Sequence, residues 1–472
     1  MHDPLDTLIG YFSGAIAVEE GDRVAVSREQ ALASPAMDEL VRSAVFAEGA
    51  ERELARWLLW EIGQEVGVRP GSIHDLYLAR GRDEIGGFTV PAMNVRGMSY
   101  DTARSIFRTA MRMNAGAFIL EIARSEIAYT AQRPAEYVSV MLAAALREGF
   151  RGPLFIQGDH FQVNAKKYAA APAAEVDSVR QLIREAGAAG FYNIDIDTST
   201  LVDLSKATLE EQQRLNYEVG VELVEYVREL EPDGIVSSVG GEIGEVGSQN
   251  STVEELRAYM DGFERTRRGR VSIGLSKISV QSGTSHGGVV LPDGSIADVK
   301  IDFQTLETLS RVARQEYGLA GAVQHGASTL PDEAFDKFPQ AETAEIHLAT
   351  NFQNILYDHI PQRLREEIYA WLRANAADER KASDTDEQFF YKTRKKALGP
   401  FKRQLWDLPD GVKATLARAY GAKFEFLFSK LAIGGTAEAV AKYVRAPELH
   451  RPAPEGAHPA VAAAPDDATL SD

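Results

Sequence analysis

Phe88-Thr89-Val90-Pro91-Ala92-Met93-Asn94 is a short, largely apolar run, and the amphipathic segment 100–114 follows it. The run predicts a buried strand, and the segment predicts a helix because its apolar residues recur at helical spacing. A buried strand followed by a helix is the repeating unit of a parallel sheet. The run and the segment therefore place this part of the chain in the α/β class.

The same unit of strand and helix recurs along the chain. Seven more strands are predicted, at 117–122, 153–157, 191–196, 235–240, 277–282, 319–324 and 344–349. Helices are predicted between most of them, at 135–148, 173–189, 209–230, 253–265 and 303–317. Eight such units in one row predict a closed (β/α)8 TIM barrel rather than an open sheet.

The regions outside this alternation predict an N-terminal extension, additional C-terminal helices and a tail. Residues 1–85 are predicted to form a helical extension that packs on the barrel or on a second subunit, because apolar residues recur at helical spacing over 41–66. The barrel with its C-terminal helices is predicted to span 86–445. Residues 446–472 are rich in proline, alanine, aspartate and glycine without periodicity, and we expect them to be disordered.

Composition limits the partners that the chain is expected to have. Its net charge of −18 argues against nonspecific nucleic-acid binding. No stretch approaches the roughly 20 apolar residues of a membrane span, and Met1 to Leu8 lacks the basic region of a secretory signal. We therefore expect a cytoplasmic protein with no nucleic-acid partner and no membrane partner. Because the chain has no cysteine, a metal would have to bind histidine, aspartate or glutamate.

Three histidines follow predicted strands and stand close to glycine: His160, His286 and His325. In a barrel of this kind the carboxyl ends of the strands form the active site, so we expect these imidazoles to meet at one mouth. Neutral imidazole is the commonest metal ligand, and three protein ligands with one open position describe a catalytic zinc site. The alternative is that each histidine is a hydrogen-bonded core or loop residue.

Three acids accompany these histidines at the predicted mouth. Asp159 directly precedes His160, where it could move a proton to or from a substrate hydroxyl, or could instead orient the ligand histidine. Glu242 follows the fifth predicted strand and is a candidate for a further metal ligand. Glu245 is a second acid on the same glycine-rich loop. The alternative for both glutamates is a solvated loop position.

Small residues with accessible backbone N–H groups at the same strand ends are candidates for holding a phosphate. They are Gly287, Gly326, Ser328, Thr350 and Asn351. Lys166 and Lys167 follow His160 closely and could reach an anionic group, although a solvated basic pair is the ordinary interpretation.

Six segments of the chain resemble, in order and spacing, those of the class II, metal-dependent fructose-bisphosphate and ketose-bisphosphate aldolases. They are 88–94, 158–167, 240–247, 283–288, 324–329 and 345–351. The similarity covers roughly residues 86–430. It implies a sugar phosphate as substrate and zinc, or another divalent transition metal, as cofactor. It also makes a monovalent cation a further candidate cofactor, and it implies a homodimer or larger homo-oligomer.

The resemblance also assigns roles to individual residues. It implies metal ligation by His160, His286 and His325. Glu242 would be a carboxylate close to the metal, and Asp159 would be the acid/base at the C4 oxygen. By the same resemblance, a phosphate and the rest of the substrate would be held by Gly287, Gly326, Ser328, Thr350 and Asn94.

The sequence departs from the family pattern at positions on the side of the site that would hold the ketone half of the substrate. Val289-Val290 stands where the family usually has a lysine, and His347 replaces the asparagine that touches the ketone. The loop glutamate that takes the proton from the carbon nucleophile is absent from 247–251, although Glu245 could replace it from a different place. The metal-binding positions are unchanged.

The expected function is a zinc-dependent class II aldolase that reversibly cleaves the C3–C4 bond of a phosphorylated ketose, with His347 in the substrate site. The first alternative is a non-catalytic aldolase-like subunit that stabilises a partner, which the changed loop favours. The second alternative is another metal enzyme on a barrel, such as a hydrolase. Against it, 90–96 lacks the His-x-His pair typical of barrel hydrolases.

Overall fold

The computed structural model describes residues 4–244, 249–283, 291 and 301–454, and within them eight parallel strands close into a barrel. The strands are β4 (Val90–Asn94), β5 (Ile119–Ala123), β6 (Gly152–Gln162), β7 (Asn193–Asp197), β8 (Ser238–Glu242), β9 (Lys277–Val280), β10 (Ala322–Gln324) and β11 (Glu345–Leu348). Their order around the barrel is β6-β5-β4-β11-β10-β9-β8-β7, and β7 pairs again with β6. The predicted (β/α)8 barrel is confirmed.

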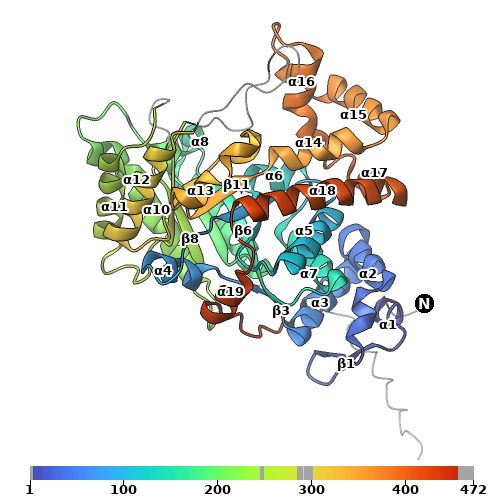
Figure 1. Cartoon of the computed structure of the whole chain (residues 1–472). Coiled ribbons are helices and arrows are strands. Elements are labelled where there is room, and N and C mark those ends of the chain that lie inside the picture. Colours follow the sequence, from blue (N-terminus) through green and yellow to red (C-terminus); the bar gives the residue numbers. More distant parts are fainter. Residues whose placement is uncertain (1–3, 245–248, 284–290, 292–300, 455–472) are drawn as a thin grey trace, which may run out of the picture.

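Helices connect the strands and cover the outside of the barrel (Figure 1). Those that follow the strands are α5 (Ser99–Met113), α6 (Arg124–Tyr129), α7 (Pro134–Glu148), α8 (Ala165–Ala170), α9 (Pro172–Ala189), α10 (Leu209–Glu229), α11 (Val253–Arg267), α12 (Phe303–Tyr317) and α13 (Lys337–Gln340). Each long helix buries an apolar face, as Ile106 and Phe107 do in α5. The predicted helices agree with these bounds to within one or two residues.

Strand β6 is longer than the sequence predicts. The apolar run ends at Gln157, yet the strand continues to Gln162, with a shift in its register against β7 between Gly158 and Phe161. His160 lies in this β-bulge with a φ of +42°, a backbone conformation that costs a non-glycine residue on the order of 1–3 kcal/mol. Bulges of this kind re-aim side chains beside active sites. The bulge therefore sets the directions of Asp159 and His160 at the mouth of the barrel.

The N-terminal region contains helices, as predicted, and also three short strands. Its elements are α1 (Pro4–Gly10), β1 (Ile16–Glu19), β2 (Arg23–Val26), α2 (Pro35–Phe46), α3 (Gly49–Val66), β3 (Val68–Gly71) and α4 (His74–Gly81). Helices α2 and α3 pack on α7, and β3 pairs in parallel with the first half of β6. Four-residue strands are too short to show a hydrophobic period, and the Pro70-Gly71 pair is tolerated in β3 because it is an edge strand. The pattern of this region therefore predicts only its helices.

Further helices follow the last barrel strand, as the sequence predicts. They are α14 (Thr350–His359), α15 (Gln362–Asn375), α16 (Asp386–Thr393), α17 (Lys402–Trp406), α18 (Asp410–Lys430) and α19 (Ala437–Tyr443). Helix α18 packs on α5 and α14. Figure 1 shows α15 and α16 beyond α14, at the end of the view opposite to β1. None of the helices in the described part of the chain is long and apolar enough to cross a membrane.

Residues 446–454 lie against α3 rather than being disordered. Nε1 of Trp60 donates to the carbonyl of Leu449 at 2.6 Å, and the guanidinium of Arg451 stacks over the Trp60 ring at 3.3 Å. The backbone N–H of Arg451 donates to the carboxylate of Glu61 at 2.8 Å. The prediction of a disordered tail is wrong for these nine residues, because their order depends on partners almost 400 positions away in the sequence that composition does not reveal.

We expect a chain that ends at Arg445 to melt several degrees below the full chain. The truncation removes the hydrogen bonds of residues 449 and 451 to Trp60 and Glu61, and a hydrogen bond to a charged group contributes about 1.5–3 kcal/mol. Thermal unfolding followed by circular dichroism measures the change. A chain that ends at Pro454 keeps every contact named above and is the matched control, so equal melting temperatures for the two would contradict the prediction. Residues 455–472, the rest of the predicted tail, lie outside the described residues.

Candidate active site

The carboxyl ends of the barrel strands open into a cavity of about 1570 Å³. The residues of the predicted site that line it are Asn94, Asp159, His160, Glu242, His325, Gly326, Ser328, His347 and Thr350. Lys167 also lines the cavity, whereas Lys166 and Asn351 do not. Three further predicted residues, Glu245, His286 and Gly287, lie outside the described residues.

His160 is held by a carboxylate from the neighbouring strand. Its Nδ1 lies 3.0 Å from Oδ2 of Asp197, the last residue of β7. A carboxylate on one ring nitrogen is the usual partner of a metal-binding histidine, because it fixes the tautomer and puts the lone pair on the other nitrogen. Burial lowers the pKa of His160, but Asp159, Asp197 and Glu242 raise it more strongly, so that this pKa lies well above 6.5. The surroundings of the ring thus favour a positive charge.

His160, His325 and Glu242 form a group of donor atoms suited to a metal. The two rings lie 4.2 Å apart between centroids, and one donor atom from each of the three side chains lies within 4.8 Å of the others. Burial, and after it the charge of Asp197, raises the pKa of Glu242 to about 8, and a nearby cation would favour its ionised form. Imidazole nitrogens with a carboxylate oxygen are donors that zinc and related divalent metals accept. The residues present therefore fit the metal that the resemblance implies.

Asp159 lies beside this donor group and is 6% exposed. Its Oδ1 is 3.8 Å from Nε2 of His160, and its Oδ2 accepts a hydrogen bond from Nδ2 of Asn94 at 3.5 Å. Asn94 is the last residue of β4 and Asp159 lies in the bulge of β6, so two strands fix this carboxylate. The position is the one that an acid or base acting next to a metal-bound substrate would need.

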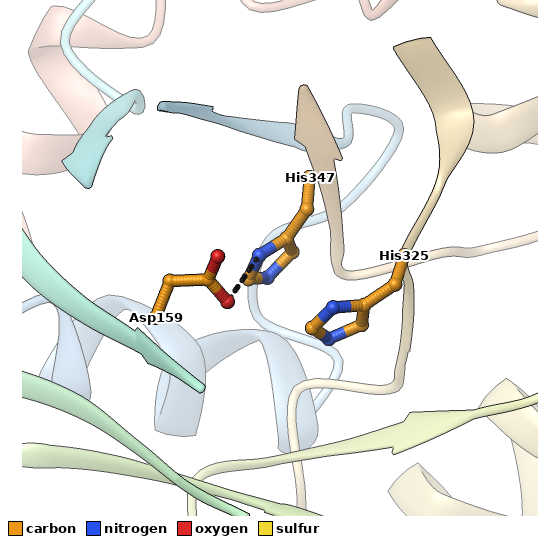
Figure 2. A group of neighbouring side chains, drawn as sticks. All are labelled: Asp159, His325 and His347. Carbon is orange, nitrogen blue, oxygen red and sulfur yellow. Dashed lines mark ion pairs between the residues drawn. The ribbon is translucent and has the colours of Figure 1, made fainter. Parts of the chain in front are cut away.

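His347 lies within β11 rather than beyond its end, and its side chain is 6% exposed. Its ring stacks on that of His325, with 4.0 Å between centroids and 20° between planes. Nδ1 of His347 lies 3.1 Å from Oε1 of Glu121 and 3.3 Å from Oδ1 of Asp159, and Nε2 lies 2.8 Å from Oε1 of Glu345. Figure 2 shows the two rings side by side, with the carboxylate of Asp159 directed at the ring of His347. Asp159, His325 and His347 thus form a second group, in which one donor atom from each side chain lies within 4.8 Å of the others.

A buried ionic network lies inside the barrel and was not predicted from the sequence. Nζ of Lys277 lies 2.6 Å from Oε1 of Glu345 and 2.9 Å from Oδ1 of Asp195, and it donates to Oε1 of Gln157 at 2.8 Å. Burial lowers the pKa of Lys277, but Asp195 and Glu345 raise it above its ordinary value, so the ammonium stays charged. Through Glu345 the network reaches His347. The signal is present in the sequence, because Asp195, Lys277 and Glu345 lie inside the predicted strands 191–196, 277–282 and 344–349.

The candidate phosphate cradle lies where β10 and β11 end. Gly326 has a φ of +71°, which glycine adopts without strain. Oγ of Ser328 accepts hydrogen bonds from the backbone N–H of Ala349 at 2.5 Å and of Thr350 at 3.2 Å. Thr350 is the first residue of α14, and the start of a helix carries a partial positive charge. The turn after β10 is therefore joined to the start of α14 at the wall of the cavity, where an anion would be stabilised.

Three solved structures are similar to the chain over most of its length. A probable tagatose 6 phosphate kinase from Sinorhizobium meliloti 1021 shares 16% identity, with a TM-score of 0.51 and coverage of 75% of this chain and 98% of that chain. A fructose-bisphosphate aldolase from Campylobacter jejuni shares 16% identity, with a TM-score of 0.46 and coverage of 78% and 97%. A fructuronate-tagaturonate epimerase from Cohnella laeviribosi shares 12% identity, with a TM-score of 0.49 and coverage of 92% and 90%. At 16% identity the likeness to the first of these structures concerns the fold.

A family model provides the more specific comparison. No curated protein matches the chain at a significant level. The model of fructose-bisphosphate aldolase class-II, however, matches residues 82–403, which include every strand of the barrel and helices α14, α15 and α16. The chain therefore belongs to the class II fructose-bisphosphate aldolase family.

Proposed function

We propose that this protein is a zinc-dependent aldolase that reversibly cleaves the C3–C4 bond of a phosphorylated ketose. Membership of the family supports a lyase-type enzyme. The observation that carries the finer proposal is the group of donor atoms of His160, His325 and Glu242 at the barrel mouth, with Asp159 beside it. His286 is proposed as a third imidazole ligand on the resemblance alone. A divalent metal held by these residues supplies Lewis-acid polarisation of the substrate ketone.

Asp159 is proposed to move the proton at the C4 oxygen. In the cleavage direction its carboxylate accepts the proton of the C4 hydroxyl, the C4–O bond becomes a carbonyl, and the electron pair of the C3–C4 bond stays on C3. A proton is then returned to C3, and Glu245 is the proposed donor. Asn94 and His347, at 3.5 Å and 3.3 Å from the carboxylate oxygens of Asp159, hold it in place for the first transfer.

The start of α14 is proposed to hold a phosphate of the substrate. Gly326, Ser328 and Thr350 line the cavity there, and Oγ of Ser328 accepts from the backbone N–H of Thr350, the first residue of the helix, and of Ala349 before it. The hydroxyl hydrogen of Ser328 and the helix dipole both favour a bound oxyanion. Gly287 is proposed as a further contact on the resemblance alone.

The proposed function is tested by measuring kcat/KM of the purified, zinc-containing chain with bisphosphorylated, singly phosphorylated and unphosphorylated ketoses. We expect cleavage of at least one ketose and no cleavage after removal of the metal with a chelator. Because His347 stands where the family has an asparagine, we expect fructose 1,6-bisphosphate to be a weak substrate. A preference for fructose 1,6-bisphosphate by a wide margin would contradict the inference from His347. Failure to cleave any ketose would instead favour the alternative of a non-catalytic subunit.

A further inference from the structure

The buried ionic network inside the barrel has no direct access to the active-site cavity. Its charged members Glu345, Lys277 and Asp195 belong to β11, β9 and β7, and none of them is more than 6% exposed. Within the described structure none of the three lines the cavity, whereas His347 does. These charges therefore do not touch a bound substrate, and any effect that they have on the reaction has to pass through other side chains.

The carboxylate of Glu345 is the centre of this network. Its Oε1 lies 2.6 Å from Nζ of Lys277 and accepts a hydrogen bond from Nε2 of Gln157 at 2.9 Å. Its Oε2 accepts a hydrogen bond from the hydroxyl of Tyr77, which belongs to α4. Burial raises the pKa of Glu345, but Lys277 and then His347 lower it far below its ordinary value, so the carboxylate stays ionised. Donors from three different elements thus fix both oxygens of Glu345.

The ring of His347 lies between this fixed carboxylate and the active site. Glu345 and His347 are two positions apart on β11, so their side chains leave the same face of the strand. Nε2 of His347 lies 2.8 Å from Oε1 of Glu345, and Nδ1 lies 3.3 Å from Oδ1 of Asp159. A carboxylate on one ring nitrogen holds an imidazole in a fixed orientation, as in a Ser-His-Asp triad. Glu345 therefore determines which way Nδ1 of the ring points.

Stabilisation of the barrel is the ordinary role of buried charges, but it accounts poorly for this network. The interior of such a barrel is filled mainly by bulky branched apolar residues. A buried ion pair gains little over apolar side chains of similar volume, because removing two charges from water costs about as much as their attraction returns. Orientation of the His347 ring is the contribution that apolar side chains could not make.

We propose that Glu345 and Lys277 are positioning residues for the proton transfer at the C4 oxygen. The inference rests on the proposed function, in which Asp159 accepts the proton of the C4 hydroxyl. Lys277 fixes the carboxylate of Glu345, and this carboxylate fixes the ring of His347. Nδ1 of the ring in turn holds Oδ1 of Asp159. Without Glu345 the ring can turn away, and Asp159 then spends less time in the orientation that accepts the proton.

The first test is kcat and KM of the variant Glu345→Gln, measured on the full, zinc-containing chain with the best ketose of the panel. The amide keeps the shape of the side chain but has only one acceptor oxygen. We expect kcat to fall about 10- to 100-fold, the usual cost of changing a residue that orients a histidine at a metal site, while KM changes less than about threefold. Lys277→Met is expected to behave in the same way. Glu136→Gln is the matched control, because Glu136 is also a buried carboxylate paired with a lysine, Lys402, but lies on α7 and does not line the cavity.

The second test repeats Glu345→Gln in the Asp159→Asn background. A residue that acts through Asp159 loses its effect when Asp159 cannot accept the proton, so we expect kcat to change less than about threefold there. Tyr77→Phe removes only the hydroxyl that donates to Glu345 and is the milder variant if Glu345→Gln does not fold. It should show a smaller fall in kcat that also disappears with Asp159→Asn. An equal loss in both backgrounds, or unchanged kcat in the folded variants, would overturn the proposal.

A third readout does not depend on activity. Nitrogen NMR of the chain with ¹⁵N-labelled histidine reports the two ring nitrogens of His347, whose signals are assigned by their loss in His347→Asn. We expect Glu345→Gln to shift these signals and Glu136→Gln to leave them in place. Unshifted signals in Glu345→Gln would show that Glu345 does not hold the ring. If the signals shift but no ketose is cleaved, the positioning of His347 stands and the proposed aldolase function fails.

Discussion

The variant Asp159→Asn is expected to retain the bound metal and to lose about 10²- to 10⁴-fold in the rate of ketose cleavage, the usual contribution of a positioned acid or base. The amide cannot accept the proton of the C4 hydroxyl, yet it fills the same space between Asn94 and His347. Metal content by elemental analysis and kcat for the best ketose of the panel measure the two parts of the prediction.

The control for this variant is Asp177→Asn, an exposed aspartate on α9 that pairs with Arg180. It is expected to keep both metal and rate. Near wild-type turnover in Asp159→Asn would show that Asp159 only supports the fold. Loss of the metal together with the rate would assign Asp159 to holding or orienting the metal ligands, for which its contacts with His160 and His347 are also suited.

The variant His325→Ala is expected to lose more than about 100-fold in metal affinity, because removing even an indirect partner of a ligand typically costs 10- to 100-fold. His325 stands between the two donor groups, since its ring contacts both His160 and His347. Cleavage should fall to background at ordinary zinc concentrations. Competition with a zinc-binding dye measures the affinity, and the same preparation is used for the rate.

The matched control is His359→Ala, an exposed histidine at the end of α14 whose Nδ1 contacts the carbonyl of Ile355. It should bind zinc as the unaltered chain does. A His325→Ala protein that folds, binds zinc with unchanged affinity and cleaves ketoses would exclude His325 as a ligand. Circular dichroism of the variant distinguishes loss of the site from loss of the fold.

The barrel was predictable because its signal is local and repeated. A short apolar strand and an amphipathic helix show their periods within a few residues, and β4 to β11 follow that pattern. The end of β6 was not predictable in the same way, because Gly158, Asp159 and His160 break the apolar run where the strand continues through a bulge. We expected His160, His325 and Glu242 at one mouth because active sites of such barrels lie at the carboxyl ends of the strands. All three residues line the same cavity.

The parts of the site that could not be predicted depend on contacts between segments that are far apart in the sequence. The position of His347 against His325, Glu121 and Glu345 requires the closed barrel, since β11, β5 and the end of β10 contribute to it. Lys395 lies close enough to Arg96 for their charges to interact, although about 300 residues separate them in the chain, and no local pattern in the sequence shows this proximity. Similarly, composition could not show that 446–454 lies against α3.

The most direct test of the account is the position of the metal in a crystal of the zinc-containing protein, from anomalous scattering measured on both sides of the zinc edge. We predict one strong peak about 2.0–2.2 Å from a ring nitrogen of His160 and of His325 and close to Glu242. Two other described donor groups exist, one of Asp159, His325 and His347 and one of Glu121, Glu345 and His347. A peak on either of these without His160, or no peak in protein that cleaves ketoses, would contradict the proposed metal centre.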